Sequence, residues 1–210
     1  MWAVRFVILA MLVVMVGVFG YLLKNRKRYE RVLEDRFINL GLVITYNVFC
    51  YLIVLLPSAT NCIFLSVFSA NPLVRFGFSM VGSILICSGI VLSVVTARQR
   101  KVLGGQDVQG GLMTSGTYRY FRHPIYAGIV WVCLGLPLVT RNLDGLLMFP
   151  AVLGVNVAQA VVEERCDMRP RFRERYDAYS RTTRMFGPVW LWGIIAAFLL
   201  ILLIGDLAIQ

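Results

Sequence analysis

Long apolar runs alternate with short polar and basic segments along most of the chain. A run of about 20 mostly apolar residues is long enough to cross a bilayer as a helix. Six runs approach that length, and we expect each to form a membrane-spanning helix. They cover residues 2–23, 37–56, 77–97, 124–139, 145–162 and 188–207. Between them, residues 58–76 contain only a short apolar stretch followed by Asn71-Pro72, so we expect an outer loop with an interfacial segment.

The composition indicates that lipid is the main solvent of this chain. It is 59% hydrophobic and only 15% charged, and its mean hydropathy is +0.74. A soluble domain of 210 residues exposes too much surface to tolerate such a composition. We therefore predict an all-α integral membrane protein with about six spans and no separate soluble domain. No cluster of aromatic and basic residues suggests an RNA or DNA site, so we expect no nucleic-acid partner.

The distribution of basic residues predicts the orientation. Cytoplasmic segments of membrane proteins are enriched in Lys and Arg. Residues 24–36, 98–122 and 163–186 hold six, five and seven of them, which is 18 of the 21 in the chain. These three segments share one side if there are six spans and both termini lie outside. The first span then acts as an uncleaved anchor, because its positive cluster follows the apolar run.

The same layout predicts three parts of the chain. Residues 1–97 form three N-terminal spans, 98–188 form a core with a cytosolic pocket, and 189–210 form a last span. The short polar turn at 141–144 makes the fourth and fifth spans an antiparallel hairpin. The end of the fifth span, at Glu163-Glu164, should therefore lie near the start of the fourth, at His123-Pro124.

The start of the fourth span is a candidate anion-binding site. Proline is favoured at the first position of a helix, so Pro124 should begin one. The backbone amides of residues 125–127 would then face the cytosolic boundary, where a helix N-terminus attracts anions. Arg122 and His123, the chain's single histidine, would add donors. The alternative is that Arg122, His123 and Tyr126 only anchor the span at the interface.

The segment "EERCDMRPRFRERYDAY", residues 163–179, places two glutamates at the end of an apolar span. Carboxylates are costly there unless they have a partner, so Glu163 and Glu164 bind a cation, pair with nearby arginines or form a solvated helix end. Beyond them, an apolar stripe at helical spacing predicts an amphipathic helix that serves for packing. Its members are Met168, Phe172, Tyr176 and Tyr179. Pro170 is expected to break this helix from the fifth span or to begin it.

Two further features bear on chemistry. The glycine-bearing loop "LGGQDVQGGLMTSG" allows close backbone approach to a ligand but matches neither a Walker A nor a GxGxxG pattern, and it can equally be a flexible connector. The five cysteines include no CxxC pair, and only one histidine is present. We therefore expect no metal site, and cysteines that behave as small apolar residues rather than a structural disulfide.

Together these pieces resemble the integral-membrane methyltransferases of the isoprenylcysteine carboxyl methyltransferase and phospholipid methyltransferase type. The resemblance rests on "LMTSGTYRYFRHPIYAG" at 112–128, on the paired glutamates followed by Tyr-x-x-Tyr, and on "RMFGP" at 184–188. It covers about 90 residues, from 100 to 188. The first three spans resemble the family only in being spans.

The resemblance implies a cytosolic pocket for S-adenosylmethionine in the C-terminal half of the chain. The zwitterionic methionine end of S-adenosylmethionine would need an anion-binding site for its carboxylate and a negatively charged partner for its ammonium group. Aromatic rings could flank the adenine or the sulfonium. No catalytic residue is assigned, because the methyl donor carries the chemistry. The expected cofactor-binding residues are Gly110, Gly111, Leu112, Met113, Tyr118, Arg122, His123, Pro124, Ile125, Tyr126, Glu163 and Glu164.

The expected activity is methylation of a lipid or lipidated substrate at the cytosolic membrane interface. An isoprenylcysteine-like carboxylate is one candidate acceptor. Many family members carry an arginine one turn before the second glutamate, for the carboxylate of the acceptor. Here that position is Ala160, with Asn156 and Gln159 nearby, which puts specificity for a prenylcysteine carboxylate in doubt and leaves cofactor binding unaffected. The short chain favours a prokaryotic plasma membrane.

Two other classes remain open from the residues. Membrane sterol and isoprenoid reductases bind NADPH in a comparable pocket, and Cys166-Asp167 is compatible with them, although "RHPIY" and "EER" favour a methyl donor. A non-catalytic binding protein or small transporter is the other. A transporter should carry polar residues at mid-membrane, and the spans have few.

Overall fold

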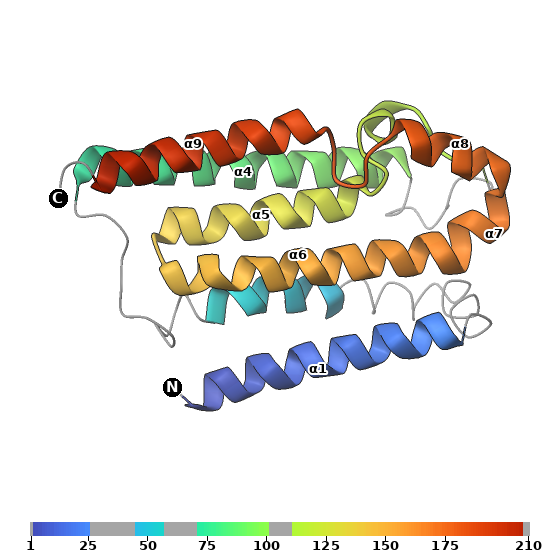
Figure 1. Ribbon diagram of the computed structural model, residues 1–210, viewed down its shortest axis with the longest axis horizontal. Helices are drawn as coiled ribbons and strands as arrows, with labels where there is room; N and C mark the ends of the chain where they lie inside the picture. Colours follow the sequence, from blue (N-terminus) through green and yellow to red (C-terminus); the bar gives the residue numbers. More distant parts are fainter. Residues whose placement is uncertain (1, 26–44, 57–70, 101–110, 208–210) are drawn as a thin grey trace.

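The computed structural model describes residues 2–25, 45–56, 71–100 and 111–207. In these ranges, all regular secondary structure longer than one residue is helical. The predicted all-α fold is confirmed (Figure 1). The long helices are α1 (Trp2–Lys24), α4 (Pro72–Gln99), α5 (Pro124–Thr140), α6 (Leu143–Glu163) and α9 (Val189–Leu207). A further helix covers Thr45–Leu56, and the rest of the predicted span 37–56 lies outside the described residues.

Among the residues that the structure describes, two helical stretches are long and apolar enough to cross a membrane, by length and composition. They are Pro72–Gln99 and Leu143–Phe172, with mean hydropathies of 2.3 and 1.8. Shorter apolar helices cover Thr45–Leu56, Pro124–Thr140 and Val189–Leu202. The apolar helical bundle is thus as the sequence indicates, while the count of six spans stays a prediction.

The prediction of a loop over residues 58–76 is wrong for its last residues. Residues 57–70 lie outside the described part, but α4 already begins at Pro72. Asn71 provides the reason, because its side-chain oxygen accepts hydrogen bonds from the amides of Leu73 (2.9 Å) and Val74 (3.4 Å). An asparagine cap followed by proline at the first helical position starts a helix rather than a loop.

The expected break at Pro170 is also wrong. The helix continues from Leu143 to Phe172, through a π-helical turn, η3 (Glu164–Met168), and α7 (Arg169–Phe172). In the π turn the Arg169 amide donates to the carbonyl of Glu164, five residues earlier, and this altered register lets the helix pass Pro170. The break comes at Arg173, whose φ is 46°, and α8 (Glu174–Thr182) follows.

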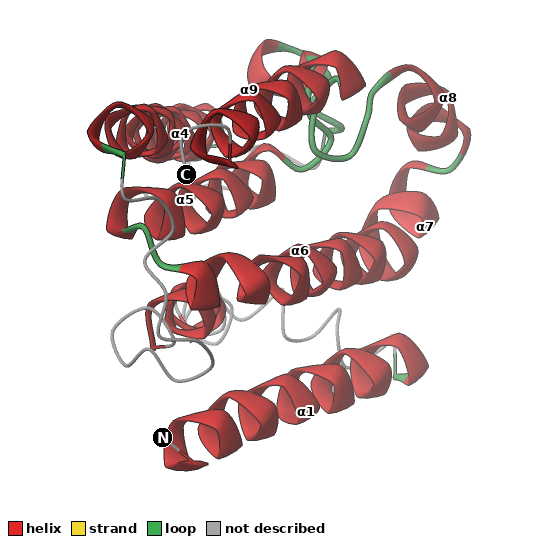
Figure 2. Ribbon diagram, turned by 60° about the vertical axis from the view of Figure 1, so that its left-hand side comes forward, coloured by secondary structure: helices red, strands yellow, loops and turns green. Residues whose placement is uncertain are grey.

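The helices α5 and α6 form the predicted antiparallel hairpin. Arg141 ends α5 in a left-handed conformation with φ 55°, and the Asn142 side chain accepts a hydrogen bond from the Gly145 amide (3.1 Å) to begin α6. Figure 1 shows α5 between α4 and α6, with α9 along α4 and α1 on the far side of α6. The same order is visible in the turned view of Figure 2.

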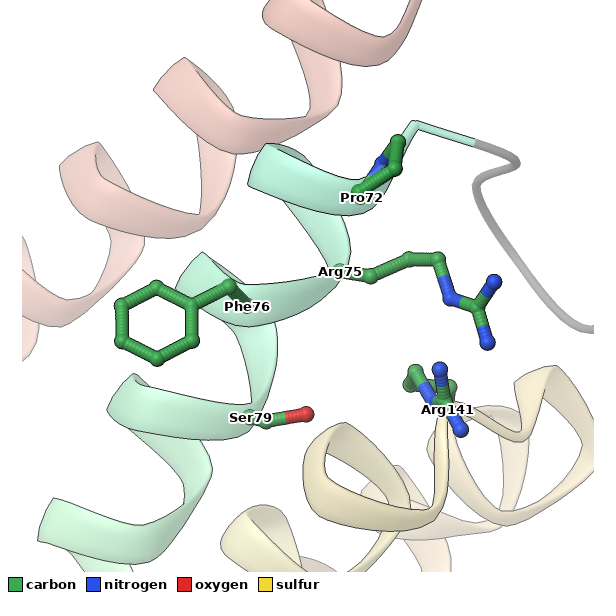
Figure 3. Close-up of a pocket in the computed structure, with 5 residues that line it drawn as sticks. All are labelled: Pro72, Arg75, Phe76, Ser79 and Arg141. Carbon is green, nitrogen blue, oxygen red and sulfur yellow. The ribbon is translucent and has the colours of Figure 1, made fainter.

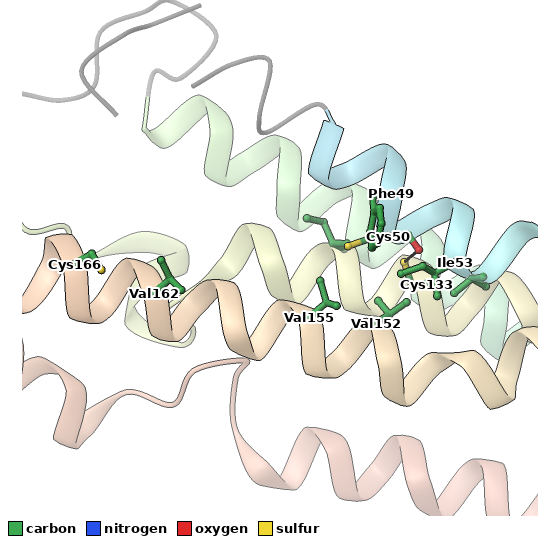
Figure 4. Packing of buried hydrophobic residues seen from close by; sticks show 10 residues of the cluster. Phe49, Cys50, Ile53, Cys133, Val152, Val155, Val162 and Cys166 are labelled. Atoms are coloured by element: carbon green, nitrogen blue, oxygen red, sulfur yellow. Dashed lines mark hydrogen bonds between the residues drawn. The ribbon is translucent and has the colours of Figure 1, made fainter. Parts of the chain in front are cut away.

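A buried apolar cluster holds the helix Thr45–Leu56 against α5 and α6 (Figure 4). Two cysteines lie in it without any exposure, Cys50 and Cys133, and the Cys133 thiol approaches the Cys50 carbonyl at 3.7 Å. They pack as small apolar residues, as expected. The remaining buried members of the cluster are Phe49, Ile53, Val54, Ile129, Val152, Val155, Val162 and Cys166.

The most extensive helix contact, between α4 and α5, depends on glycines. Gly82 lies against Gly135, and Gly89 lies against Gly128, so two glycines seven residues apart on each antiparallel helix face each other. A Cβ atom at Gly89 would come within 2.5 Å of the Gly128 carbonyl oxygen and 2.9 Å of Val132 Cγ2. Small residues let helix backbones approach closely where lipid supplies no hydrophobic drive for association.

We expect Gly89→Ala to reduce the free energy of unfolding by about 1–3 kcal/mol, because the added methyl group forces α4 and α5 apart. The matched control is Gly154→Ala on α6, where an added Cβ meets nothing within 4 Å. This control should be neutral or slightly stabilising. Thermal unfolding of both variants in detergent, followed by circular dichroism, measures the difference. Equal midpoints for the two variants would show that the close contact is not needed.

Candidate functional site

The loop between α4 and α5 is fastened to the end of α4. It contains the short helix η2 (Gly116–Arg119), and Gly116 has a φ of 62°. The Thr117 amide and hydroxyl both donate to the side-chain oxygen of Gln99, at 3.2 and 2.8 Å. The hydroxyl of Thr96 donates to that of Thr117 at 3.1 Å. The beginning of the "TYRYFRHP" segment is therefore held in place by the last turn of α4.

The "RMFGP" segment holds the other end of this loop. The amide of Arg122 donates to the carbonyl of Arg184 (2.9 Å), and the amide of His123 donates to that of Met185 (3.1 Å). Residues 122–123, directly before α5, are thus hydrogen-bonded through their backbone to a segment more than 60 residues later in the sequence.

Tyr179 on α8 adds a third support to the loop. Its hydroxyl donates a 2.6 Å hydrogen bond to the carbonyl of Tyr118. Tyr176 and Tyr179 are both buried, with ring centroids 6.1 Å apart. This agrees with the packing role predicted for the apolar stripe.

At the centre of the site, His123 lies between the two glutamates. Its Nε2 is 3.1 Å from Oε1 of Glu164, and its Nδ1 is 3.4 Å from Oε2 of Glu163. The predicted proximity of the end of α6 and the start of α5 is confirmed. Since a carboxylate accepts hydrogen bonds and both ring nitrogens face one, the arrangement favours the doubly protonated, cationic imidazole.

Two arginines complete this charged cluster. Nη1 of Arg122 is 3.3 Å from Oε1 of Glu164, and Nη1 of Arg100 is 4.0 Å from Oε1 of Glu163. The side chains of His123 and Glu164 are only 5% and 8% exposed. Buried charges of this kind persist only when they are paired. We call these five residues, Arg100, Arg122, His123, Glu163 and Glu164, the charged cluster.

The electrostatics of His123 follow from these contacts. Burial alone would lower its pKa, because the charged form loses hydration. The hydrogen bonds and negative charges of Glu163 and Glu164 outweigh burial and raise the pKa of His123 above its usual value. Tyr126 stacks on the imidazole, with ring centroids 5.5 Å apart and planes within 11° of parallel. The imidazole of His123 is thus held by a carboxylate at each ring nitrogen and by the ring of Tyr126 on one face.

The structure brings five of the predicted site residues together: Arg122, His123, Tyr126, Glu163 and Glu164. Tyr118 joins them indirectly, because the guanidinium carbon of Arg100 lies 5.9 Å from the centre of its ring. The other predicted residues lie around this group or outside it.

Pro124 occupies the first position of α5, as expected, and Ile125 packs against the apolar cluster around Cys50. Gly111 is exposed before η2, and Leu112 and Met113 are half-buried there. Gly110 lies outside the described residues.

The anion-binding site predicted at the start of α5 is arranged differently in the structure. Arg122 and His123 direct their side chains to Glu163 and Glu164, so the protein's own carboxylates already face this helix end. Of the alternatives for the glutamates, pairing with cationic side chains is the one realised. Their partners are His123, Arg122 and Arg100, rather than arginines of residues 163–179.

Sequence reasoning missed Arg100 and the backbone role of residues 184–185. Arg100 follows the apolar run of α4 among other basic residues, and only the packing of α4 brings it to Glu163. The "RMFGP" motif was a signal, but nothing in its composition indicates that its carbonyls pair with Arg122 and His123.

The fold and site define an all-helical membrane protein with a buried charged cluster at one end of its bundle. Residues 78–175 match the family model described as Phospholipid methyltransferase, and this segment contains the whole charged cluster. This segment, which makes up just under half of the chain, is therefore similar to the phospholipid methyltransferase family, in line with the resemblance of the sequence motifs.

A curated relative supports the same placement. The chain is 27% identical over 115 residues to the Protein-S-isoprenylcysteine O-methyltransferase of Schizosaccharomyces pombe. The match covers 55% of this chain and 48% of that protein, so the chain spans about half the length of this relative. No solved structure gave a significant match.

The single histidine allows a direct test of the charged cluster. In detergent micelles, ¹⁵N-histidine NMR should give one set of imidazole resonances, since the chain contains one histidine. We expect a pKa above the ordinary value of about 6.5, and a lower pKa in Glu163→Gln and Glu164→Gln. Glu174→Gln, which changes an exposed glutamate of α8, is the matched control and should leave it unchanged.

The raised pKa of His123 determines how the stability of the fold changes with pH. Because folding raises the pKa, protonated His123 stabilises the fold fully below about pH 6.5. This contribution is lost as the pH rises through the folded-state pKa. A measured pKa at or below 6.5 would contradict the proposed contacts.

Proposed function

We propose that this protein is an S-adenosylmethionine-dependent methyltransferase that acts on a lipid or lipidated substrate at the membrane interface. The observation that carries the proposal is the charged cluster, in which His123 joins Glu163 and Glu164. It is built from the "RHPIY" and "EE" motifs of the segment that matches the methyltransferase family. Ionisable groups are retained in apolar surroundings mainly where function needs them.

The charges of the cluster fit an amino-acid zwitterion. With His123 protonated, three cations face two carboxylates, a net charge of +1. The buried Nε of Arg122 has no hydrogen-bond partner among the described residues. An unpaired buried donor is costly, and this N–H could donate a hydrogen bond to the carboxylate of the methionyl group. Glu164 is the candidate partner of its ammonium group.

Aromatic side chains would complete the pocket. Tyr126 stacks on His123, and Tyr118 lies beside Arg100. Rings so placed can contact the adenine or the positive sulfonium by cation–π attraction. We propose that the cofactor pocket is formed by Gly110, Gly111, Leu112, Met113, Tyr118, Arg122, His123, Pro124, Ile125, Tyr126, Glu163 and Glu164.

The bound S-adenosylmethionine supplies an electrophilic methyl group. The residues of the chain have to align the acceptor with the methyl–sulfur bond and exclude water. An acceptor that is already deprotonated needs no base. Because Glu163 and His123 are engaged with each other, neither is a free proton acceptor. This favours an acceptor atom that carries its lone pair without proton transfer.

The surroundings of the cluster bear on the acceptor. Ala160 is fully buried and carries no charge, so this turn of α6 supplies no cation for a carboxylate. Gln159 directs its amide to the hydroxyl of Tyr126 at 3.5 Å, and Asn156, one turn earlier in α6, is completely buried. These neutral groups suit an acceptor recognised by hydrogen bonds rather than by its charge.

The location of the site follows from the charge distribution. We propose six spans with both termini outside, so that the charged cluster faces the cytosol of a prokaryotic plasma membrane. Figure 1 is consistent with this layout, because α1 begins and α9 ends at the end of the bundle opposite to α8. In this arrangement residues 1–97 and 189–210 embed the catalytic core of residues 98–188 in lipid, and the acceptor reaches it from the bilayer.

The proposal predicts methyl transfer from radiolabelled S-adenosylmethionine into organic-soluble material when the purified protein is mixed with a lipid extract. Glu164→Gln should lose about tenfold or more in affinity for the cofactor, because it removes the candidate partner of the ammonium group and leaves Arg122 without its counter-charge. Calorimetry measures the affinity, and chromatography of the labelled product identifies the acceptor.

Glu174→Gln serves again as the matched control, since it makes the same chemical change on an exposed glutamate. It should bind the cofactor and transfer the methyl group as the unmodified protein does. The absence of saturable S-adenosylmethionine binding to the folded, unmodified protein would rule the proposal out. Binding of reduced nicotinamide instead, seen by fluorescence, would favour the reductase class.

A further inference from the structure

A second cluster of cationic side chains lies at the other end of the bundle, beside the turn between α5 and α6. Arg75, in the first turn of α4, and Arg141, in the turn, line an open hollow of about 370 Å³. Figure 3 shows their guanidinium groups turned toward the same space. The remaining lining residues are Pro72, Phe76 and Ser79.

No ion pair within the described part of the chain neutralises these two arginines. Neither forms an ion pair with any side chain that the structure describes, and the buried Nε of Arg141 has no hydrogen-bond partner there. The segment before α4, residues 57–70, contains no Asp or Glu. The N-terminus of α4 adds partial positive charge. Two like charges beside each other are unfavourable unless an anion lies between them.

We propose that Arg75 and Arg141 bind the phosphate group of an anionic membrane lipid. Guanidinium groups bind phosphate oxygens through paired, charge-assisted hydrogen bonds. A lipid is favoured over a soluble phosphate because apolar side chains are exposed in the first turn of α4: Phe76, which lines the hollow, is 68% exposed, and Leu73 in the same turn is 79% exposed. An acyl chain can lie along these side chains while the phosphate lies between the arginines.

The site is separate from the proposed cofactor pocket. The 17-residue helix α5 lies between His123 at one end and Arg141 at the other, which corresponds to about 25 Å at 1.5 Å per residue. A lipid bound here does not reach the charged cluster with its headgroup. It would brace the start of α4 against the α5–α6 turn, at the end of the bundle away from the cofactor pocket.

Native mass spectrometry of the full chain tests the proposal, with dioleoylphosphatidylglycerol or dioleoylphosphatidylcholine added to the delipidated protein. The expected result is preferential binding of phosphatidylglycerol, weakened about tenfold or more in R75Q/R141N. Asparagine is chosen at 141 because it tolerates the left-handed backbone there. The control R175Q/R181Q removes the same charge from exposed positions of α8 and should bind the lipid like the unmodified protein.

Three outcomes would overturn the proposal. One is equal binding of phosphatidylglycerol by R75Q/R141N and the unmodified protein. Another is an equal loss in R175Q/R181Q, which would indicate an effect of net charge alone. The third is displacement of the lipid by an equimolar amount of inorganic phosphate, which would make the ligand a soluble anion. If R75Q/R141N does not fold, R75Q alone leaves the turn intact and should show a smaller loss in the same direction.

Discussion

The contacts of His123 with Glu163 and Glu164 connect the beginning of α5 to the end of α6, and the site depends on them. The imidazole and both carboxylates are largely buried, so each charge needs the others. Arg122 and Arg100 bring in the interhelical loop and the end of α4. One small set of ion pairs therefore joins three helices at the boundary of an apolar bundle, where hydrophobic burial alone would not specify how they meet.

Two features of the chain make these contacts possible. The glycines of α4 and α5 let the two backbones approach closely, which brings the end of α4 beside the start of α5. The two-residue connection at Arg141 and Asn142 returns α6 antiparallel to α5, so that both glutamates arrive beside His123. The charged groups of the site are thus positioned by close packing and by a tight turn rather than by the loop itself, and this rigid support suits the proposed cofactor pocket.

Much of this arrangement could be predicted from the sequence, because long apolar runs and a short turn leave few ways to fold. The proximity of His123 to Glu163 and Glu164 followed from the hairpin alone. Other features depend on contacts between distant segments. Arg100 reaches Glu163 only through the packing of α4, and the helix passes Pro170 because a π turn alters its hydrogen-bond register. The start of α4 was misjudged because the asparagine cap at position 71 was read as part of a loop.

We have proposed that the charged cluster forms part of the cofactor pocket, and the single histidine allows this to be measured directly. Its ring nitrogens can be followed by NMR while S-adenosylhomocysteine, the demethylated product of the cofactor, is titrated into the protein. We expect a saturable change in both resonances, with the same affinity that calorimetry gives. Saturable binding by calorimetry with unchanged histidine resonances would place the cofactor elsewhere and contradict the proposal.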